Sequence, residues 1–254
     1  MEENKPKNPI QDKSFIFGLV AGLAAISTIA LIALLIYIFT GGRSTCLAGT
    51  NNGSNGSPTG KVSKNFEACL ASTKYDSRIQ ADQSEGTQLG VQGTPATFVN
   101  GYLVSGALPY EAFKQVIDEL LADKTPNDTF LQDQTTKKVI KVDMPQITES
   151  DHVTGAKNGK ITLVEFSDFQ CPYCGKNKTT MDQILKAYPN DVTLVFKHFP
   201  LSFHPFAKPA AVASECANEQ SKFWEMYDKL FALNNNSTLS LETIKSAATE
   251  IGLK

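Results

Sequence analysis

The chain has 254 residues, of which 41% are hydrophobic and 20% are charged. This composition is typical of one or two globular domains and excludes a chain that is disordered throughout. The net charge of −2 gives no strong electrostatic attraction to nucleic acid, so we expect no nucleic-acid partner. Three histidines are too few for a histidine-rich metal store, and we expect no metal and no other cofactor.

One long apolar segment lies near the N-terminus. Phe15–Phe39 carries no ionisable side chain except that of Tyr37. As a helix it would be about 37 Å long, enough to cross a hydrocarbon core of about 30 Å, and it is longer than the apolar core of a secretory signal. It predicts a retained transmembrane anchor over residues 14–40. Because lysines are more frequent before this segment than basic residues just after it, we expect residues 1–13 in the cytoplasm and everything after the anchor outside the cell membrane.

Residues 41–61 are mostly Gly, Ser, Asn and Thr. Such a segment cannot bury a core and predicts a flexible tether. The remaining residues, 62–254, are therefore expected to form the folded extracytoplasmic part.

The clearest local pattern surrounds a pair of cysteines. Ile161–Phe166 has the apolar character of a buried strand, and Cys171-Pro172-Tyr173-Cys174 follows it at the start of a helical pattern that stops at Pro189. Val192–Phe196 is a second apolar strand. The sequence thus predicts a strand–helix–strand unit with a Cys-x-x-Cys at the turn from strand to helix.

A hairpin is predicted earlier in the chain. Ala96–Val99 and Tyr102–Ser105 flank Asn100-Gly101, a dipeptide that suits a two-residue turn with positive φ angles. Pro109 then begins an amphipathic helix. Further helices are predicted around Phe66–Leu70, Tyr75–Leu89, Pro209–Asn218, Phe223–Phe231 and Ser240–Ile251.

Five motifs together resemble those of the DsbA-like thioredoxin family. They are Glu165–Cys174 with its Cys-Pro-Tyr-Cys, Lys197–Pro200, Glu219–Trp224, Phe66–Leu70, and Gly93-Thr94-Pro95 before Phe98–Gly101. The resemblance covers nearly all of residues 62–254. It implies an α/β fold, a thioredoxin fold with an inserted helical subdomain.

The order of the two halves differs from that family. The half with Thr94-Pro95, residues 62–123, precedes the half with the Cys-x-x-Cys, residues 161–254, and the polar segment 124–160 links them. We interpret the chain as circularly permuted, because moving the chain ends to an exposed connection changes few native contacts. The alternative is two incomplete halves that are completed by exchange with a second molecule or that come from a rearranged gene.

The position of the cysteine pair predicts a redox site. At the N-terminus of a helix, Cys171 lies near free N–H groups that favour its thiolate, so we expect it to be exposed and to be the attacking nucleophile. Cys174 would then be the resolving thiol. Pro172 and Tyr173 would tune the reduction potential and contact substrate. The alternative is a static bridge or half of a zinc site.

Other roles follow from the resemblance. It implies that Pro95 is cis and packs against the cysteine pair, and that the backbone of Thr94 pairs with an extended substrate. It also implies that Glu165 is the buried acid that takes the proton of Cys174, although a charge at a strand edge in water remains the alternative. His198 and His204 are packing residues or modulators of the site. Phe169, Tyr173, Phe199 and Phe203 form either an apolar rim for substrates or part of the core.

Two further cysteines lie on helical patterns of the inserted subdomain. In an oxidising compartment Cys69 and Cys216 would form a structural disulfide, with two buried free thiols as the alternative. Cys46 is then left without a partner, and its role stays open.

We therefore expect an enzyme, a protein thiol–disulfide oxidoreductase. Its partners would be cysteine-containing extracytoplasmic proteins and a membrane redox partner that recycles the cysteine pair. An oxidase that forms disulfides is favoured over a reductase or isomerase, because a thiol of low pKa stabilises the reduced enzyme. A non-catalytic protein-binding module with a structural Cys-x-x-Cys is the alternative from another class.

Overall fold

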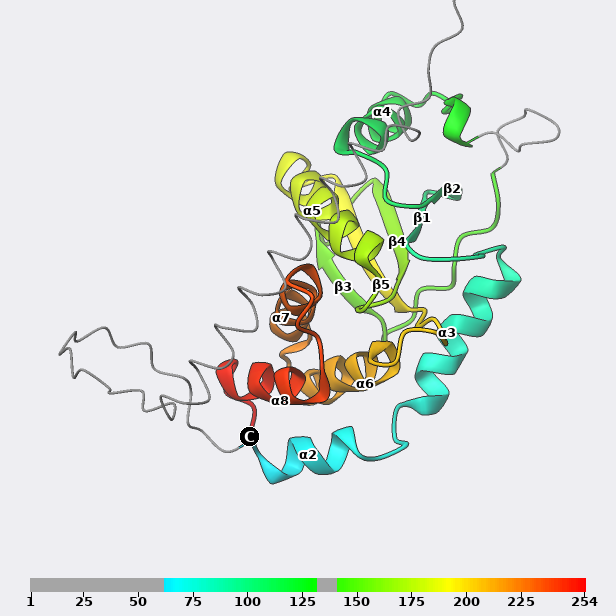
Figure 1. The fold of residues 1–254 in the computed structure, drawn as a ribbon. Coiled ribbons are helices and arrows are strands. Elements are labelled where there is room, and N and C mark those ends of the chain that lie inside the picture. The colour runs from blue at the N-terminus through cyan, green and yellow to red at the C-terminus, as the bar shows by residue number, and fades with distance from the viewer. Residues whose placement is uncertain (1–61, 132–140) are drawn as a thin grey trace, which may run out of the picture. The chain divides into compact units, whose positions relative to one another are not determined.

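The computed structural model describes residues 62–131 and 141–254, which belong to one compact unit of the chain, Gly56–Lys254 (Figure 1). The expected anchor at residues 14–40, the tether at residues 41–61 and Cys46 lie outside the described residues. Within the described ranges, the helices are all too short or too polar to cross a membrane.

A five-stranded mixed sheet forms the centre of this unit. The strands are β1 (Ala96–Val99), β2 (Tyr102–Ser105), β3 (His152–Gly155), β4 (Ile161–Ser167) and β5 (Val192–His198). Their order in the sheet is β2-β1-β4-β5-β3. Only the central pair β4 and β5 is parallel, and the other neighbours are antiparallel. The sheet confirms the expected α/β class and brings the hairpin of the first half beside the Cys-x-x-Cys strand of the second.

The hairpin turn forms as the sequence predicted. Asn100 and Gly101 have φ angles of 47° and 93°, which a glycine and an asparagine tolerate better than other residues. The Asn100 side chain also accepts a hydrogen bond from the Thr162 amide at 2.8 Å and donates to the Lys160 carbonyl at 3.1 Å. These bonds fix the register between β1 and β4.

Helices cover both faces of the sheet (Figure 1). α3 (Asp76–Gln88) lies on one face, where Gly86 approaches the ring of Phe166 so closely that a Cβ would lie 2.9 Å from it. α4 (Tyr110–Leu121) and α5 (Pro172–Ala187) lie on the other face and share one apolar core with β4.

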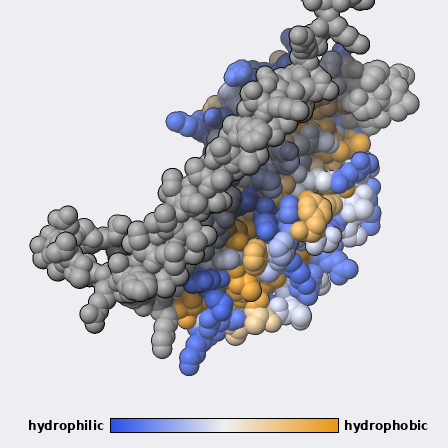
Figure 2. Space-filling view, in the orientation of Figure 1, coloured by the Kyte–Doolittle hydropathy of each residue, from blue (hydrophilic) through white to orange (hydrophobic). Residues whose placement is uncertain are grey.

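The remaining helices form the expected helical subdomain. They are α2 (Lys64–Leu70), α6 (Ala207–Asn218), α7 (Phe223–Asn235) and α8 (Leu241–Glu250). Lys245 of α8 pairs with Glu67 of α2 at 3.1 Å, and Val62 and Leu253 pack in the same apolar cluster. The first described residues and the C-terminus are therefore neighbours (Figure 1). Hydrophobic and hydrophilic residues alternate in patches over the visible outer surface (Figure 2).

The segment expected to be only a polar linker contains secondary structure. Within residues 124–160, a short 3-10 helix spans Thr129–Leu131 and β3 forms an edge of the sheet against β5. β3 is only four residues long, and it has no run of apolar residues like those of β4 and β5. Its one large apolar side chain, that of Val153, is 46% exposed. Hydrogen-bonded pairing with β5, and not the intrinsic strand propensity of its residues, stabilises β3.

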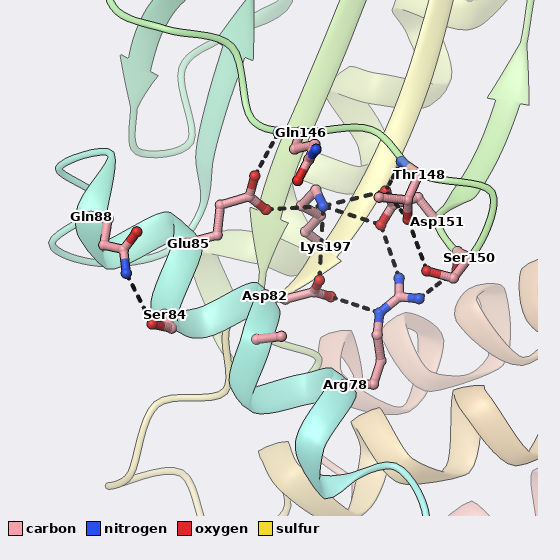
Figure 3. Close-up of a pocket in the computed structure, with 11 residues that line it drawn as sticks. Arg78, Asp82, Ser84, Glu85, Gln88, Gln146, Thr148, Ser150, Asp151 and Lys197 are labelled. Atoms are coloured by element: carbon pink, nitrogen blue, oxygen red, sulfur yellow. Dashed lines mark hydrogen bonds and ion pairs between the residues drawn. The ribbon is translucent and has the colours of Figure 1, made fainter.

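A charged network fastens the end of this segment to the rest of the fold (Figure 3). The buried ammonium of Lys197 in β5 lies 3.1 Å from Asp151 and 3.0 Å from Glu85 of α3. Arg78 of α3 also contacts Asp151, at 3.0 Å. These groups line a cavity of about 530 Å³ on the α3 side of the sheet, and Cys171 is not among its lining residues. We assign the network to positioning residues 146–151.

Candidate active site

The cysteine pair lies at the turn from β4 to α5, as the sequence predicted. Cys171 occupies the N-cap position of α5 with an extended backbone (φ −69°, ψ 123°), and Pro172 is the first helical residue. Proline suits that position because its missing N–H would have no partner inside the helix. Cys174 is one turn further into the helix. In the described chain the two cysteines are free thiols.

The hairpin half brings a proline to the first cysteine. The Thr94–Pro95 peptide bond is cis, as expected. In its thiol form Cys171 donates from Sγ to the Thr94 carbonyl oxygen at 3.4 Å, although 77 residues separate them. Thr94, Pro95 and Cys171 are thus neighbours within one chain.

Cys171 differs from the expectation in one respect. We expected an exposed thiol, but the residue is only 3% exposed, because its sulfur points back toward the Thr94 carbonyl. Its pKa is nevertheless lowered to about 6, chiefly by a hydrogen bond from the Cys174 thiol, with the backbone N–H groups of Cys174 and Tyr173 adding to the effect. The thiolate is therefore the main form at neutral pH.

The pKa of Cys174 is shifted in the opposite direction to that of Cys171. Cys174 is fully buried, and desolvation together with the neighbouring Cys171 raises its pKa well above the ordinary value. The Asp168 amide points at its sulfur at 3.4 Å. The pair thus consists of one acidic thiol and one thiol that holds its proton, the division that nucleophilic and resolving roles require.

Glu165 lies in the interior of β4 and is fully buried, so the alternative of a solvated strand-edge charge is wrong. Burial raises its pKa to about 7, and neither carboxylate oxygen has a hydrogen-bond partner among the described residues. A carboxyl group with this pKa can gain or lose a proton near neutral pH.

The loop around the site is organised by the buried carboxylate of Asp168. It accepts hydrogen bonds from the Gln170 amide at 2.7 Å, the Leu201 amide at 2.9 Å and Nδ1 of His204 at 2.7 Å. His204 is therefore a hydrogen-bonded packing residue. Sequence reasoning did not single out Asp168, because an aspartate in a loop carries no distinctive pattern.

The proposed aromatic rim is only half correct. Tyr173 and Phe203 are 59% and 73% exposed, so both present aromatic surface to solvent. Phe169 and Phe199 are buried and belong to two different apolar clusters of the core. Pro172 is exposed beside Tyr173.

The C-terminal end of α7 also contacts the site, a contact that sequence reasoning did not predict. The Asn234 side chain donates to the Cys171 carbonyl at 2.8 Å. Gly175 of α5 approaches α7 so closely that a Cβ would lie 2.1 Å from Oδ1 of Asn235. A Cβ at position 175 would therefore have to displace the exposed side chain of Asn235.

The predicted structural disulfide is present. Cys69 of α2 and Cys216 of α6 are bonded at 1.99 Å across 147 residues of sequence. The alternative of two free thiols is wrong for this structure. The bridge joins one helix from each half of the chain.

A buried group of three residues has the composition of a metal site. Nε2 of His152 and Nε2 of His198 each lie 2.8 Å from the same Oε1 of Glu215, and their ligand-type atoms all lie within 4.8 Å of one another. Each contact is a complete hydrogen bond, so the group is explained without an ion. It ties β3, β5 and α6 together, and His198 serves in this packing.

A mixed sheet with a Cys-x-x-Cys at a helix N-terminus and a cis proline beside it defines a thioredoxin-type domain. A family model described as Thioredoxin matches residues 35–119 and 147–251, well over half of the chain. The chain therefore belongs to the thioredoxin family.

Curated relatives match over a shorter stretch. The chain is 42% identical over 95 residues to the Na(+)/H(+) antiporter NhaA 3 of Salinispora tropica, which covers 37% of the chain and 14% of the antiporter. It is 32% identical over 121 residues to the Na(+)/H(+) antiporter NhaA of Herminiimonas arsenicoxydans, covering 48% of the chain and 19% of the antiporter. The chain thus spans less than a fifth of either protein, and antiport is a property of those proteins.

Among solved structures, DsbA2 of Pseudomonas aeruginosa is 26% identical, with a TM-score of 0.33. The match covers 41% of this chain and 66% of that one.

Proposed function

We propose that the protein is a membrane-anchored, extracytoplasmic thiol–disulfide oxidoreductase that donates disulfides to secreted proteins through Cys171 and Cys174. The observation that carries the proposal is the contrast between the two thiols, since the pKa of Cys171 is lowered to about 6 while that of Cys174 is raised. A stabilised thiolate favours the reduced enzyme, which makes the enzyme disulfide oxidising.

The proposed cycle begins with the Cys171–Cys174 disulfide. A substrate thiolate attacks Sγ of Cys171, the S–S bond breaks, and Cys174 leaves with the electron pair and takes up a proton. A second substrate thiolate attacks the substrate sulfur of this mixed disulfide and releases Cys171 as a thiolate. The substrate loses two electrons, the enzyme gains them, and a membrane redox partner with a disulfide or quinone must remove them again.

Three neighbouring groups have roles in this proposal. Glu165 supplies and receives the proton of Cys174, because its pKa of about 7 suits transfer in both directions. The Thr94 carbonyl, 3.4 Å from the Cys171 sulfur, pairs with the backbone of an extended substrate next to Pro95. The exposed ring of Tyr173 offers apolar surface to unfolded chains.

We also propose that the chain is a circularly permuted DsbA-like protein that folds within one molecule. Two observations support this: the Thr94 carbonyl lies against Cys171, and Val62 packs in the same cluster as Leu253. Sedimentation of the full chain in detergent tests the proposal. A monomer with one active site is expected, and activity confined to a dimer would favour exchange between molecules.

The redox experiment titrates the Cys171–Cys174 disulfide against glutathione. A potential near about −120 mV is expected for a disulfide donor, and one near about −270 mV would assign a reductase instead. Cys171→Ser should abolish oxidation of a dithiol peptide, with Cys46→Ser as the matched control that keeps it. A protein that retains peptide binding after Cys171→Ser and shows no thiol exchange would be a binding module.

The location is tested separately. A membrane-impermeant thiol reagent added to intact cells should label Cys171 of the reduced protein, as a domain outside the membrane requires. Labelling only after cell lysis would place the domain inside.

A further inference from the structure

Four buried polar side chains on the α5 side of the sheet have no hydrogen-bond partner within residues 62–131 and 141–254. They are Thr97 of β1, Glu165 and Ser167 of β4, and Asn177 of α5, and each is at most 1% exposed. Buried polar groups without partners cost free energy of about 1–3 kcal/mol each, so a fold retains such a group where it serves a purpose.

The geometry places Ser167 between the acid and the resolving thiol. Glu165 and Ser167 are two residues apart on one strand, so their side chains face the same side at a separation of about 7 Å. The amide of the next residue, Asp168, contacts the sulfur of Cys174 at 3.4 Å. Along the chain, Ser167 therefore lies between Glu165 and Asp168, the residue whose amide contacts the sulfur of Cys174.

Electrostatics agree with that placement. The Ser167 side chain lowers the pKa of both Glu165 and Cys174, so its hydroxyl lies near both groups, although it forms no hydrogen bond with either in the structure. Asn177, one helical turn after Cys174, also lowers the pKa of Glu165. A hydroxyl both accepts and donates a proton, whereas the Asp168 amide can only donate a hydrogen bond.

We propose that Ser167 carries the proton between Cys174 and Glu165, and that Asn177 is a positioning residue that holds the carboxyl group toward it. The proposal rests on the proposed function, since it concerns the proton of the resolving thiol. When Cys174 attacks a mixed disulfide on Cys171, its proton passes to the Ser167 oxygen while the Ser167 proton passes to the Glu165 carboxylate. The partner thiolate leaves and is protonated by solvent.

The proton of Cys174 needs a path through the protein because solvent does not reach Cys174 or Glu165. Cys174 and Glu165 are both fully buried. Of the other titratable groups that act on Glu165, Lys178 and Asp182 come from α5 and Tyr227 from α7. Lys178 is bound to Asp182 and Asp228, which raise its pKa, and burial raises the pKa of Tyr227 well above its ordinary value, so Lys178 and Tyr227 both keep their protons near pH 7.

The test uses the reduced full chain in detergent and oxidised glutathione. At low glutathione the rate of enzyme disulfide formation rises linearly, and this slope measures attack by Cys171. At saturation the rate reaches a plateau, which measures attack by Cys174 on the mixed disulfide. Ser167→Ala should lower the plateau at pH 7 at least tenfold and leave the slope within twofold.

Three comparisons make the result specific. Asn177→Leu should lower the plateau and move its pH midpoint upward from about 7, because the amide favours the charged carboxylate. Adding Ser167→Ala to Glu165→Gln should cause no further loss, since both remove the same path. Thr97→Val is the matched control: it removes a buried hydroxyl beside Glu165 in the sheet register and should keep the plateau.

The proposal is overturned by an unchanged plateau in Ser167→Ala, by an equal loss in Thr97→Val, or by additive losses in the double variant. A fall of the slope together with the plateau would likewise overturn it, because it indicates general damage to the fold. Failure of the proposed function gives a different result: the wild-type chain itself would then show no slope.

Discussion

At the scale of single residues, Glu165 combines complete burial with a pKa raised to about 7. In the unfolded chain the pKa of a glutamate is near 4.5, so between pH 4.5 and 7 the folded state binds more protons. Its contribution to the stability of the fold therefore decreases as the pH rises through this window.

Glu165→Gln should remove the decrease in stability that Glu165 causes as the pH rises. The variant is expected to be more stable than the wild type at pH 8 by up to about 3 kcal/mol, since one pKa unit corresponds to about 1.4 kcal/mol, and nearly equal to it at pH 4.5. Urea unfolding of residues 62–254 at both pH values measures this. An equal difference at the two pH values would contradict the raised pKa.

The acid itself could be placed from sequence, but its partners could not. Glu165 stands six residues before Cys171 in a motif that resembles a known family, which predicted its position. Ser167 and Asn177 carry no such signal, because a serine in a strand or an asparagine in a helix is usually exposed. The buried contacts of Asp168 and Glu215 depend on loops and helices that meet only in the folded chain.

At the scale of elements, Gly175 of α5 lies against the side chain of Asn235 at the end of α7. The Cβ of an alanine there would lie 2.1 Å from Oδ1 of Asn235. Gly175→Ala should therefore destabilise the fold by at most about 1 kcal/mol, because the exposed Asn235 side chain can move away and alanine is the better helix former.

Removing the Asn235 side chain should reverse the sign of the stability change that Gly175→Ala causes. In an Asn235→Ala background the same Gly175→Ala change should be neutral or stabilising by up to about 1 kcal/mol, because only the helix propensity difference remains. Thermal unfolding of the four proteins in this cycle measures the coupling. Equal costs in both backgrounds would mean that another contact excludes the side chain.

Elements with strong apolar periodicity were predicted well and the irregular ones were not. The hairpin strands agree with the structure, and β4, β5 and α5 were placed to within a few residues. β3 was missed because four residues with an exposed valine resemble a linker, and only the pairing with β5 makes them a strand. Phe169 and Phe199 were ambiguous because aromatic residues suit both a core and a substrate surface.

At the scale of the whole molecule, the Cys69–Cys216 bridge joins the two halves of the chain across 147 residues. A cross-link over so long a segment restricts the unfolded chain strongly, by about 4–5 kcal/mol in the chain-entropy model. Replacing both cysteines by serine should lower the free energy of unfolding by about 2–5 kcal/mol.

The same double variant should leave the redox chemistry intact. The absorbance of the Cys171 thiolate at 240 nm should still titrate near pH 6, as the pKa of that thiol requires. A shift of this titration together with the stability loss would show that the bridge also shapes the active site.

Val62 and Leu253 pack in the same apolar cluster, and this has a consequence for how the chain can be reconnected. Two ends of a fold that pack against one cluster can be joined by a short peptide, which turns residues 62–254 into a closed ring. Such a ring can be opened at another exposed connection, for example just before β3 or β4, so that the hairpin follows the helices in the new chain. Each such permuted chain should keep the same arrangement of side chains around Cys171.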